Sequence, residues 1–567
     1  MIFVRICKFA VGVVAFCGCS TSDYAERADK DVYAILSQAE GKLFGTASNF
    51  SLKGPDPDSA ETTTTTGILK AGAVGEKVTL DLDETLAYAI ANSRDYQSQK
   101  ERLYLTGLTL TTQRHSFRPQ FFGRSRANYL RESDGDRRGS LSSGLGLDQA
   151  FKTGGSLGLS VANDLLKYFT GDPRRSAASV LQLNVLQPIF RGAGRDIAGE
   201  QLTQANRNVI YAVRDFNHYQ NTFSVDIVNQ YFDLLQQKQV VFNQYNNYLS
   251  RKANRAYLTA RFDRESPEAI DDSKQDVLAA KNRYLEAVTS YRNSLDRFKI
   301  TLGLPQKTEL RLDDSEIERV REVGATSFAM PAAAAFEIAL GNRLPLFNQI
   351  DRFEDERRQV GLAADRLRTE LNIVGNSSLR NSGGPTDYTR FNFKDVRAEV
   401  GLQLNLPLDR LRERNNYRAT LINFEAATRE LSQDFDELRN LLDRRLRELS
   451  QFQASYQIQK GAVRLAERRV EANQLRLQAG RVIFRRLSEA QDALILAQNA
   501  ETRALVDFLN ARLNLFTELG VIDTGISRYW LAGVPAVLEP FAAIPPPPPE
   551  LDEEGEAEVI PPEILFE

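Results

Sequence analysis

The sequence predicts a mainly α-helical fold that also contains membrane-type β-strands. Two stretches, 192–262 and 409–479, are each about seventy residues long, lack proline and repeat apolar residues at helical spacing. Segments that alternate apolar and polar residues precede each stretch. The order of helix, strands, long helix, tip and returning helix occurs twice, which indicates a tandem duplication whose halves pack side by side.

In both long stretches the apolar residues recur at alternating steps of three and four, which is helical periodicity with a coiled-coil bias. At 1.5 Å per residue each helix would be roughly 105 Å long, whereas helices in globular proteins usually run about 8–20 residues. We therefore expect a molecule that spans a distance. The pattern is carried by Val209, Val213, Phe216, Phe223, Ile227, Tyr231 and Leu234, and in the second copy by Phe435, Leu438, Leu442, Leu446, Leu449, Phe452 and Tyr456.

The composition argues against several classes of function. The net charge is −3, from 72 basic and 75 acidic residues, and a nucleic-acid-binding protein would show a basic excess on its binding domain. The only histidines, His115 and His218, lie within helical patterns and are read as solvated or packed positions. No phosphate-binding glycine loop, metal-ligand cluster or nucleophile–base pair rises above chance, so we expect no enzyme activity, no cofactor and no metal.

The first eighteen residues resemble a secretory signal peptide, with basic residues followed by an apolar run and small residues. The three cysteines, Cys7, Cys17 and Cys19, all lie at this end, so the folded body has no thiol for a disulfide framework. The stretch 16–19, Phe-Cys-Gly-Cys, resembles a bacterial lipobox and would make Cys19 a lipidated first residue. Phe16 stands where leucine is usual, and an ordinary signal peptide is the alternative. Residues 19–79 are expected to be an N-terminal segment and linker.

Residues 80–305 form the first predicted repeat. A helix capped by Asp81 or Asp83 is followed by strands, and Lys152-Thr153-Gly154-Gly155 marks a hairpin turn. The long helix breaks near Pro267 before a shorter helix returns. The expected elements are a helix at 82–117, strands at 121–130, 145–149, 157–161 and 180–186, the long helix at 192–262 and the return at 268–302.

Residues 306–331 connect the repeats, and 332–522 repeat the plan. The segment 396–406 is the cleanest strand, with apolar residues at even positions and charges and amides at odd positions. The C-terminal segment, 523–567, ends in an extended proline-rich acidic tail that begins at Pro545. The expected elements are a helix at 332–369 with a pause at Pro345, strands at 371–379 and 396–406, the long helix at 409–479 and the return at 484–519.

An eleven-residue alternating strand matches the roughly 9–11 residues that a tilted strand needs to cross a bilayer. A half-buried strand of a soluble sheet has the same alternation, but here each strand group is bounded by very long helices. No segment has 18 consecutive apolar residues, so a membrane crossing would require a β-barrel. Four to six strands cannot close a barrel, since the smallest have about eight, so a barrel would require several chains to associate.

At this point the chain resembles the TolC-type outer membrane efflux family over about residues 80–305 and 332–520. The stretches Leu183–Gly192 and Leu402–Leu408 resemble the strand-to-helix junctions of that family. Further similarity lies in the helix-tip stretches 260–272 and 477–491. Each motif is weak alone, but all of them occur in order, twice, at matching lengths.

The resemblance implies a homotrimer in the outer membrane. Four strands from each chain, or six if the 145–161 hairpin takes part, would contribute to one β-barrel, twelve-stranded in the family, and the helices to a periplasmic α-barrel. The family serves as the exit duct of tripartite efflux or type I secretion systems, with a periplasmic adaptor and an inner-membrane pump as partners. The hairpin has no counterpart in the second repeat, and it either enlarges the barrel or forms an extracellular loop.

The family gate lies at the periplasmic tip, where two acidic residues three apart often ring the pore. The corresponding positions here are Arg486 and Glu489, with Asp272 nearby, and a mixed ring would not favour cations as an acidic one does. The bland alternative for the tip arginines is solvation or adaptor contact, and Asp271-Asp272 is also a simple helix N-terminus. The residues expected at the tip or the adaptor contact are Arg261, Arg264, Gly480, Arg481 and Arg485.

Two functions remain open from the sequence. The first is a passive, gated export channel, and the second is a structural coiled-coil envelope lipoprotein without a pore. Long helices suit both, whereas alternating strands between paired helices in each repeat favour the channel.

Overall fold

The computed structural model describes residues 21–45, 50–52, 77–133, 137–169, 175–260, 267–324, 330–382, 389–479, 481–531 and 534–542. The chain divides into two compact units, and each unit draws on both sequence repeats. The first comprises Met1–Pro57, Glu101–Arg214 and Asn348–Ser432, and the second Asp58–Lys100, Asp215–Phe347 and Gln433–Glu567. The expected signal peptide, Cys19, most of the linker and the acidic tail lie outside the described residues.

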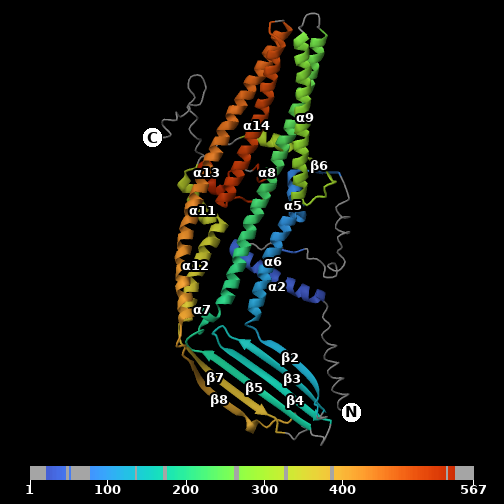
Figure 1. The fold of residues 1–567 in the computed structure, drawn as a ribbon. Coiled ribbons are helices and arrows are strands. Elements are labelled where there is room, and N and C mark those ends of the chain that lie inside the picture. Colours follow the sequence, from blue (N-terminus) through green and yellow to red (C-terminus); the bar gives the residue numbers. More distant parts are fainter. Residues whose placement is uncertain are drawn as a thin grey trace. The chain divides into compact units, whose positions relative to one another are not determined.

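One six-stranded antiparallel sheet forms the core of the first unit, in the order β2-β3-β4-β5-β7-β8 (Figure 1). The strands β2 to β5 and the pair β7–β8 are joined by short connections, which favour antiparallel neighbours, whereas β5 and β7 pair although 181 residues separate them in the chain. The sequence predicts four strands per chain in the barrel, or six with the 145–161 hairpin, and this sheet contains all six. The strands are β2 (Gln120–Arg131), β3 (Arg137–Ala150), β4 (Ser156–Tyr168), β5 (Arg175–Pro188), β7 (Glu370–Arg380) and β8 (Arg397–Asn405).

The β3–β4 hairpin is longer than the sequence pattern predicts. The predicted strands, 145–149 and 157–161, cover only the apolar centre, whereas the backbone ladder runs from Arg138↔Tyr168 to Ala150↔Ser156. The added residues are mostly polar, and polar side chains continue a strand wherever its backbone partners continue. Alternation alone therefore located the hairpin but not its ends.

The first unit also contains helices: α2 (Thr21–Phe44), most of α6 (Arg94–His115), α7 (Arg195–Ala198), and the parts of α8 (Glu200–Thr259), α12 (Leu344–Asp365) and α13 (Leu411–Gln478) assigned to it. A short 3-10 helix, η1 (Phe393–Asp395), precedes β8. Helix α2 packs on α6, where the Tyr104 hydroxyl donates to Asp29 at 2.6 Å and Val32 lies over Gly107. A Cβ at Gly107 would come within 2.7 Å of the Val32 side chain, so glycine permits this close approach.

The second unit contains a small parallel sheet and the helical hairpins. Of the two predicted caps, Asp81 and Asp83, the structure has Asp81 as the N-cap of α5, in a capping box with Glu84. The predicted helix 82–117 is two helices, because the chain breaks at Ser93. The elements are β1 (Lys77–Leu80), α5 (Leu82–Asn92), α9 (Pro267–Leu302), β6 (Glu309–Leu312), α10 (Ser315–Val323), α11 (Ala332–Asn342), α14 (Phe484–Leu519), η2 (Ala536–Leu538) and α15 (Glu539–Ala542), with the remaining parts of α6, α8, α12 and α13.

The core of the second unit lies between α8, α14 and the small sheet. Tyr231 and Phe232 of α8 and Leu505 of α14 are fully buried, and Trp530 is buried beside Arg512. Helix α14 buries many more residues than α13, whose buried positions in this unit are Leu438, Leu442, Leu449 and Tyr456. None of the described helices is long and apolar enough to cross a membrane.

Candidate functional site

The sheet has one apolar and one polar face, and both extend across all six strands. Because side chains alternate along a strand, the ladder registers decide which residues share a face. Phe121, Leu147, Leu159 and Leu183 follow one another across β2, β3, β4 and β5 on the apolar face. The other members of this face are Leu141, Leu145, Leu157, Val161, Leu165, Leu181, Val185, Leu371, Ile373, Leu379, Ala398, Val400, Leu402 and Leu404.

The apolar face is largely uncovered within the chain. Phe121 is 82% exposed, Val400 81%, Leu402 72% and Leu145 70%. A contiguous exposed apolar surface of this size marks an interaction with a partner or a membrane. The strands have 9–14 residues, the length range that spans the hydrocarbon core.

Aromatic side chains lie at both ends of this face. Phe121, Phe151 and Phe190 lie at the end where strands meet helices. At the far end Tyr129 packs against Phe169 with a ring separation of 6.2 Å, and the Lys167 ammonium lies 5.0 Å from the Phe169 ring. Aromatic belts with a basic residue at their edge are typical of the two membrane–water interfaces.

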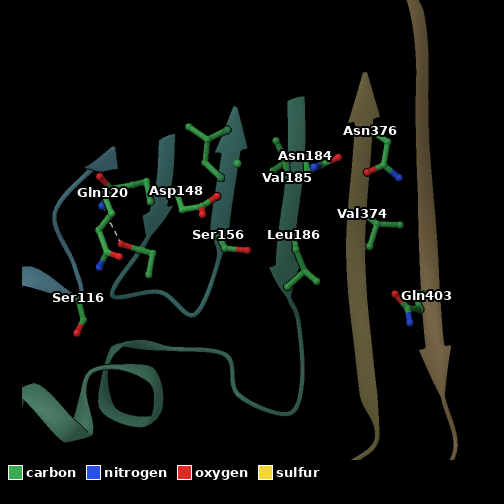
Figure 2. Close-up of a pocket in the computed structure, with 14 residues that line it drawn as sticks. Ser116, Gln120, Asp148, Ser156, Asn184, Val185, Leu186, Val374, Asn376 and Gln403 are labelled. Atoms are coloured by element: carbon green, nitrogen blue, oxygen red, sulfur yellow. Dashed lines mark hydrogen bonds between the residues drawn. The ribbon is translucent and has the colours of Figure 1, made fainter. Parts of the chain in front are cut away.

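An open hollow of about 610 Å³ lies on the polar face near the helix end of the sheet (Figure 2). Gln120, Asp148, Asn184 and Asn376 lie in one row across β2, β3, β5 and β7, and their side chains line the hollow. Farther along the strands this face carries the charges Arg124, Arg126, Asp164, Arg380, Arg397 and Glu399. This face therefore offers amides and charges of both signs to water.

The junctions between strands and helices are held by backbone-directed side chains in the first unit. Gly192 and Gly194 have positive φ angles of 78° and 100°, a conformation that is strained for residues other than glycine. The Gly192 N–H donates to Asp365 at 2.8 Å, and Arg410 donates to the Leu367 carbonyl at 2.6 Å. These contacts tie the two predicted junction motifs, 183–192 and 402–408, to the end of α12.

A partly buried ionic network joins α8 and α12. Arg207 and Arg358 pair with Asp355 at 2.6 and 2.8 Å, and the Tyr211 hydroxyl donates to Asp355 at 2.8 Å. Burial opposes the charged form of Asp355, but hydrogen bonds from Gln204, Tyr211 and Arg358 outweigh it and lower its pKa. Burial and the same carboxylate raise the pKa of Tyr211 to about 12.

The expected gate residues lie on the first turns of two helices in the second unit. Glu489 of α14 pairs with Arg485 at 3.3 Å and with Arg486 at 3.7 Å, so these three form a local cluster. Asp272 is exposed at the start of α9. Arg481 lies just before α14, and its N–H donates to the Arg476 carbonyl. Arg261, Arg264 and Gly480 lie outside the residues that the structure describes.

The strongest contact among these helices involves Arg251, which sequence reasoning missed. Its side chain is 1% exposed and pairs with Asp276 of α9 at 3.2 Å and Asp492 of α14 at 2.8 Å. It also donates to the Ser488 hydroxyl and, at 2.9 Å, to the Ser488 carbonyl. These acids lie one turn beyond the expected ones, Asp276 four residues after Asp272 and Asp492 three after Glu489, and the sequence gives no sign of which turn meets the arginine.

Hydrogen-bonded polar pairs extend this contact between the antiparallel helices α8 and α14. Asn243 donates to Asn499 at 2.7 Å, and Asn254 donates to Gln491 at 3.1 Å. Asn229 donates to Asn514 at 3.4 Å, and Asn510 donates to Asp233 at 3.3 Å. Paired polar residues inside a helical seam fix its register more than they add stability.

Residues 335–521 match the family described as outer membrane efflux protein. No relative was found among curated protein sequences. The fold is similar to that of the outer membrane channel CmeC of Campylobacter jejuni, with a TM-score of 0.56 and 13% identity over 77% of this chain and 85% of the channel.

Two further solved structures share the fold. The outer membrane protein VceC of Vibrio cholerae has a TM-score of 0.55 and 13% identity over 77% of this chain and 96% of VceC. The MtrE outer membrane channel of Neisseria gonorrhoeae, in its open state, has a TM-score of 0.56 and 11% identity over 77% and 88%. The chain has the TolC-type fold, and its residues 335–521 are similar to the outer membrane efflux protein family.

Proposed function

We propose that the protein is an outer membrane channel, the exit duct of a tripartite efflux or type I secretion system. The observation that carries the proposal is the two-faced sheet. Its exposed apolar face with aromatic side chains at both ends suits lipid, and its hollow polar face suits a water-filled passage. Transport is passive, since the residues required are those that line a path rather than those that react.

The sheet needs partners along both of its edges. Among the described strands, β2 pairs only with β3 and β8 only with β7. Open edges in lipid leave backbone groups without hydrogen bonds, which costs several kcal/mol per group in the hydrocarbon core. Copies of the same chain supply matching edges, and the family resemblance makes the assembly a homotrimer.

The helical hairpins are proposed to meet a periplasmic adaptor and, through it, an inner-membrane pump. Arg486, Glu489 and Asp272 are the proposed gate, and Arg261, Arg264, Gly480, Arg481 and Arg485 the proposed adaptor contact. The pairing of Arg485 and Arg486 with Glu489 supports a mixed ring without cation preference. Reversal potentials across a salt gradient test this, and a strong cation preference would contradict it.

Cys19 is the proposed lipid anchor in the outer membrane, alongside the inserted sheet. Labelling of cells with a radioactive fatty acid tests this directly. The intact protein should incorporate label and Cys19→Ser should not, whereas incorporation that persists in Cys19→Ser would contradict the anchor.

A coiled-coil envelope lipoprotein without a pore is the competing function. A trypsin-resistant, heat-modifiable trimer in outer-membrane fractions separates the two, because a closed membrane sheet unfolds only on heating in detergent. We expect a band that shifts after boiling. A protein that leaves the membrane with alkaline carbonate would contradict the channel.

A further inference from the structure

The β3–β4 hairpin has the dimensions of two membrane strands. The strands have 14 and 13 residues, at least as many as the roughly 9–11 that cross a bilayer. The hairpin pairs with β2 from Gln120↔Asp148 to Arg131↔Arg137 and with β5 from Ser156↔Leu186 to Lys167↔Arg175. The hairpin therefore lies inside the sheet, between the strands that a four-stranded protomer would pair directly.

Both faces of the sheet continue through the hairpin. Leu145 lies opposite Val161, and Leu147 lies opposite Leu159, on the apolar face. On the other face the Ser142 hydroxyl donates to Asp164 at 2.8 Å. In a loop exposed to water, nothing would select apolar residues in register with those of β2 and β5.

The tight turn of the hairpin lies at the end of the sheet where the helices attach. The Gly194 N–H donates to the Thr153 carbonyl at 3.1 Å, so the turn packs on the junction between β5 and α7. Gly154 has φ of +94°, and a Cβ there would lie 2.3 Å from the Gly192 carbonyl oxygen. Short turns on the helix side are the periplasmic turns of outer-membrane barrels, whose longer loops lie outside.

We infer that β3 and β4 are wall strands of the channel, so that three copies of the six-stranded sheet close eighteen strands rather than the twelve of the resemblance. The inference rests on the proposed function and concerns the same membrane segment. It selects the larger barrel over the extracellular loop as the role of the hairpin. The partner at each sheet edge is the neighbouring copy, β2 of one meeting β8 of the next.

The extra strands widen the membrane passage. Barrel diameter grows roughly linearly with strand number, and barrels of about 16–18 strands leave an aqueous channel. Eighteen strands make a wall about 1.5 times longer around than twelve at the same tilt. The membrane segment should therefore admit bulkier hydrated cargo than a twelve-stranded one.

Single cysteine substitutions test whether each position of the hairpin contacts water or lipid, since the sequence has no cysteine beyond Cys19. Ser142→Cys and Ser160→Cys place thiols on the polar face, and Leu145→Cys and Val161→Cys place them on the apolar face. The intact protein in lipid vesicles is treated with a charged, water-soluble methanethiosulfonate. We expect the first pair to react at least tenfold faster, and a fluorophore attached at the second pair to be quenched by nitroxide-labelled lipid.

Matched positions in β8 keep this test separate from the proposed function. Gln403→Cys and Val400→Cys should show the same contrast between water and lipid. If the β8 pair alternates while both faces of the hairpin react equally, the eighteen-stranded wall is overturned and the channel stands. If the β8 pair also fails to alternate, the channel proposal fails and the wall with it.

A second measurement needs no substitution. End-on electron-microscopy averages of the detergent-purified protein should show a membrane ring about 1.5 times the diameter expected for twelve strands. A ring of twelve-stranded width would overturn the inference even if every cysteine variant failed to fold.

Discussion

The sheet and the seam between α8 and α14 place apolar and charged residues in opposite ways. In the sheet, Val400 and Leu402 are exposed and polar side chains line a hollow. In the seam, Leu505 and Leu509 are buried, and the polar Arg251 is buried among its own partners. Apolar exposure in the two regions therefore fits two different surroundings, the proposed lipid for the sheet and water for the helices.

The largest effect is expected from a charge on the apolar face of the sheet. Leu402→Arg places a charge on the face assigned to lipid, which costs about 2–4 kcal/mol near the bilayer centre. The equilibrium constant for folding into vesicles should fall by roughly 30- to 1,000-fold, measured from the heat-modifiable fraction after refolding. Gln403→Arg, one residue along on the polar face, should fold nearly normally. Equal tolerance of both arginines would show that the apolar face meets water.

Arg251→Met removes the ion pairs that Arg251 makes with Asp276 and Asp492. Asp276 and Asp492 are about 40% exposed, so the loss should be about 1–3 kcal/mol rather than the larger value of a fully buried pair. Amide hydrogen exchange in 484–492 should then accelerate about 5- to 150-fold. Arg485→Met, 79% exposed, should change exchange little. An unchanged rate for Arg251→Met would contradict the role assigned to the buried arginine.

Gly154→Ala tests whether the hairpin turn packs on the junction between β5 and α7. The positive φ and the close Gly192 carbonyl predict a loss of about 1–3 kcal/mol. Gly144→Ala in β3 meets only an ordinary contact at 3.6 Å and should be neutral or slightly stabilising. Midpoints of thermal unfolding in detergent measure both. A tolerated alanine at position 154 would mean that the turn is not packed on the junction.

The smallest effect concerns His218, half-buried near Arg343, Glu518 and Asp215 in the second unit. Burial and the Arg343 charge lower its pKa in the folded state. The unfolded chain therefore binds the proton more readily, so stability should fall as pH drops below about 6.5 and continue to fall until the folded-state pKa is reached. In His218→Gln the temperature of the unfolding midpoint should change less between pH 7.5 and 5.5 than in the unchanged protein. An identical slope in the variant would assign the effect elsewhere.

The sequence predicts the helices better than the sheet. Long proline-free periodic segments locate α13 within two residues and the end of α8 within three, because the period of an amphipathic helix is visible without tertiary contacts. The start of α8 was placed eight residues early, because the short helix α7 precedes it. The full length of β3 and β4 was missed, since residues such as Ser140 and Asp164 look like loop until their ladder partners are known. All six strands of the sheet are predicted, but their ends depend on pairing, which a single sequence does not display.

The candidate tip residues show the same limit. The arginines and acids of the tip are visible in the sequence, but which of them becomes buried depends on the relative rotation of α8, α9 and α14. Arg251 lies in a stretch of polar residues that resembles a solvated helix face. Only packing distinguishes it from Arg485, which is exposed one turn before Ser488 and Glu489 on α14.

Single-channel recording in planar bilayers tests most directly whether copies of this sheet close around a passage. Purified protein that needs detergent and has the mass of three chains should give stepwise, ohmic currents. A monomer that stays in solution without detergent and produces no conductance would contradict the account.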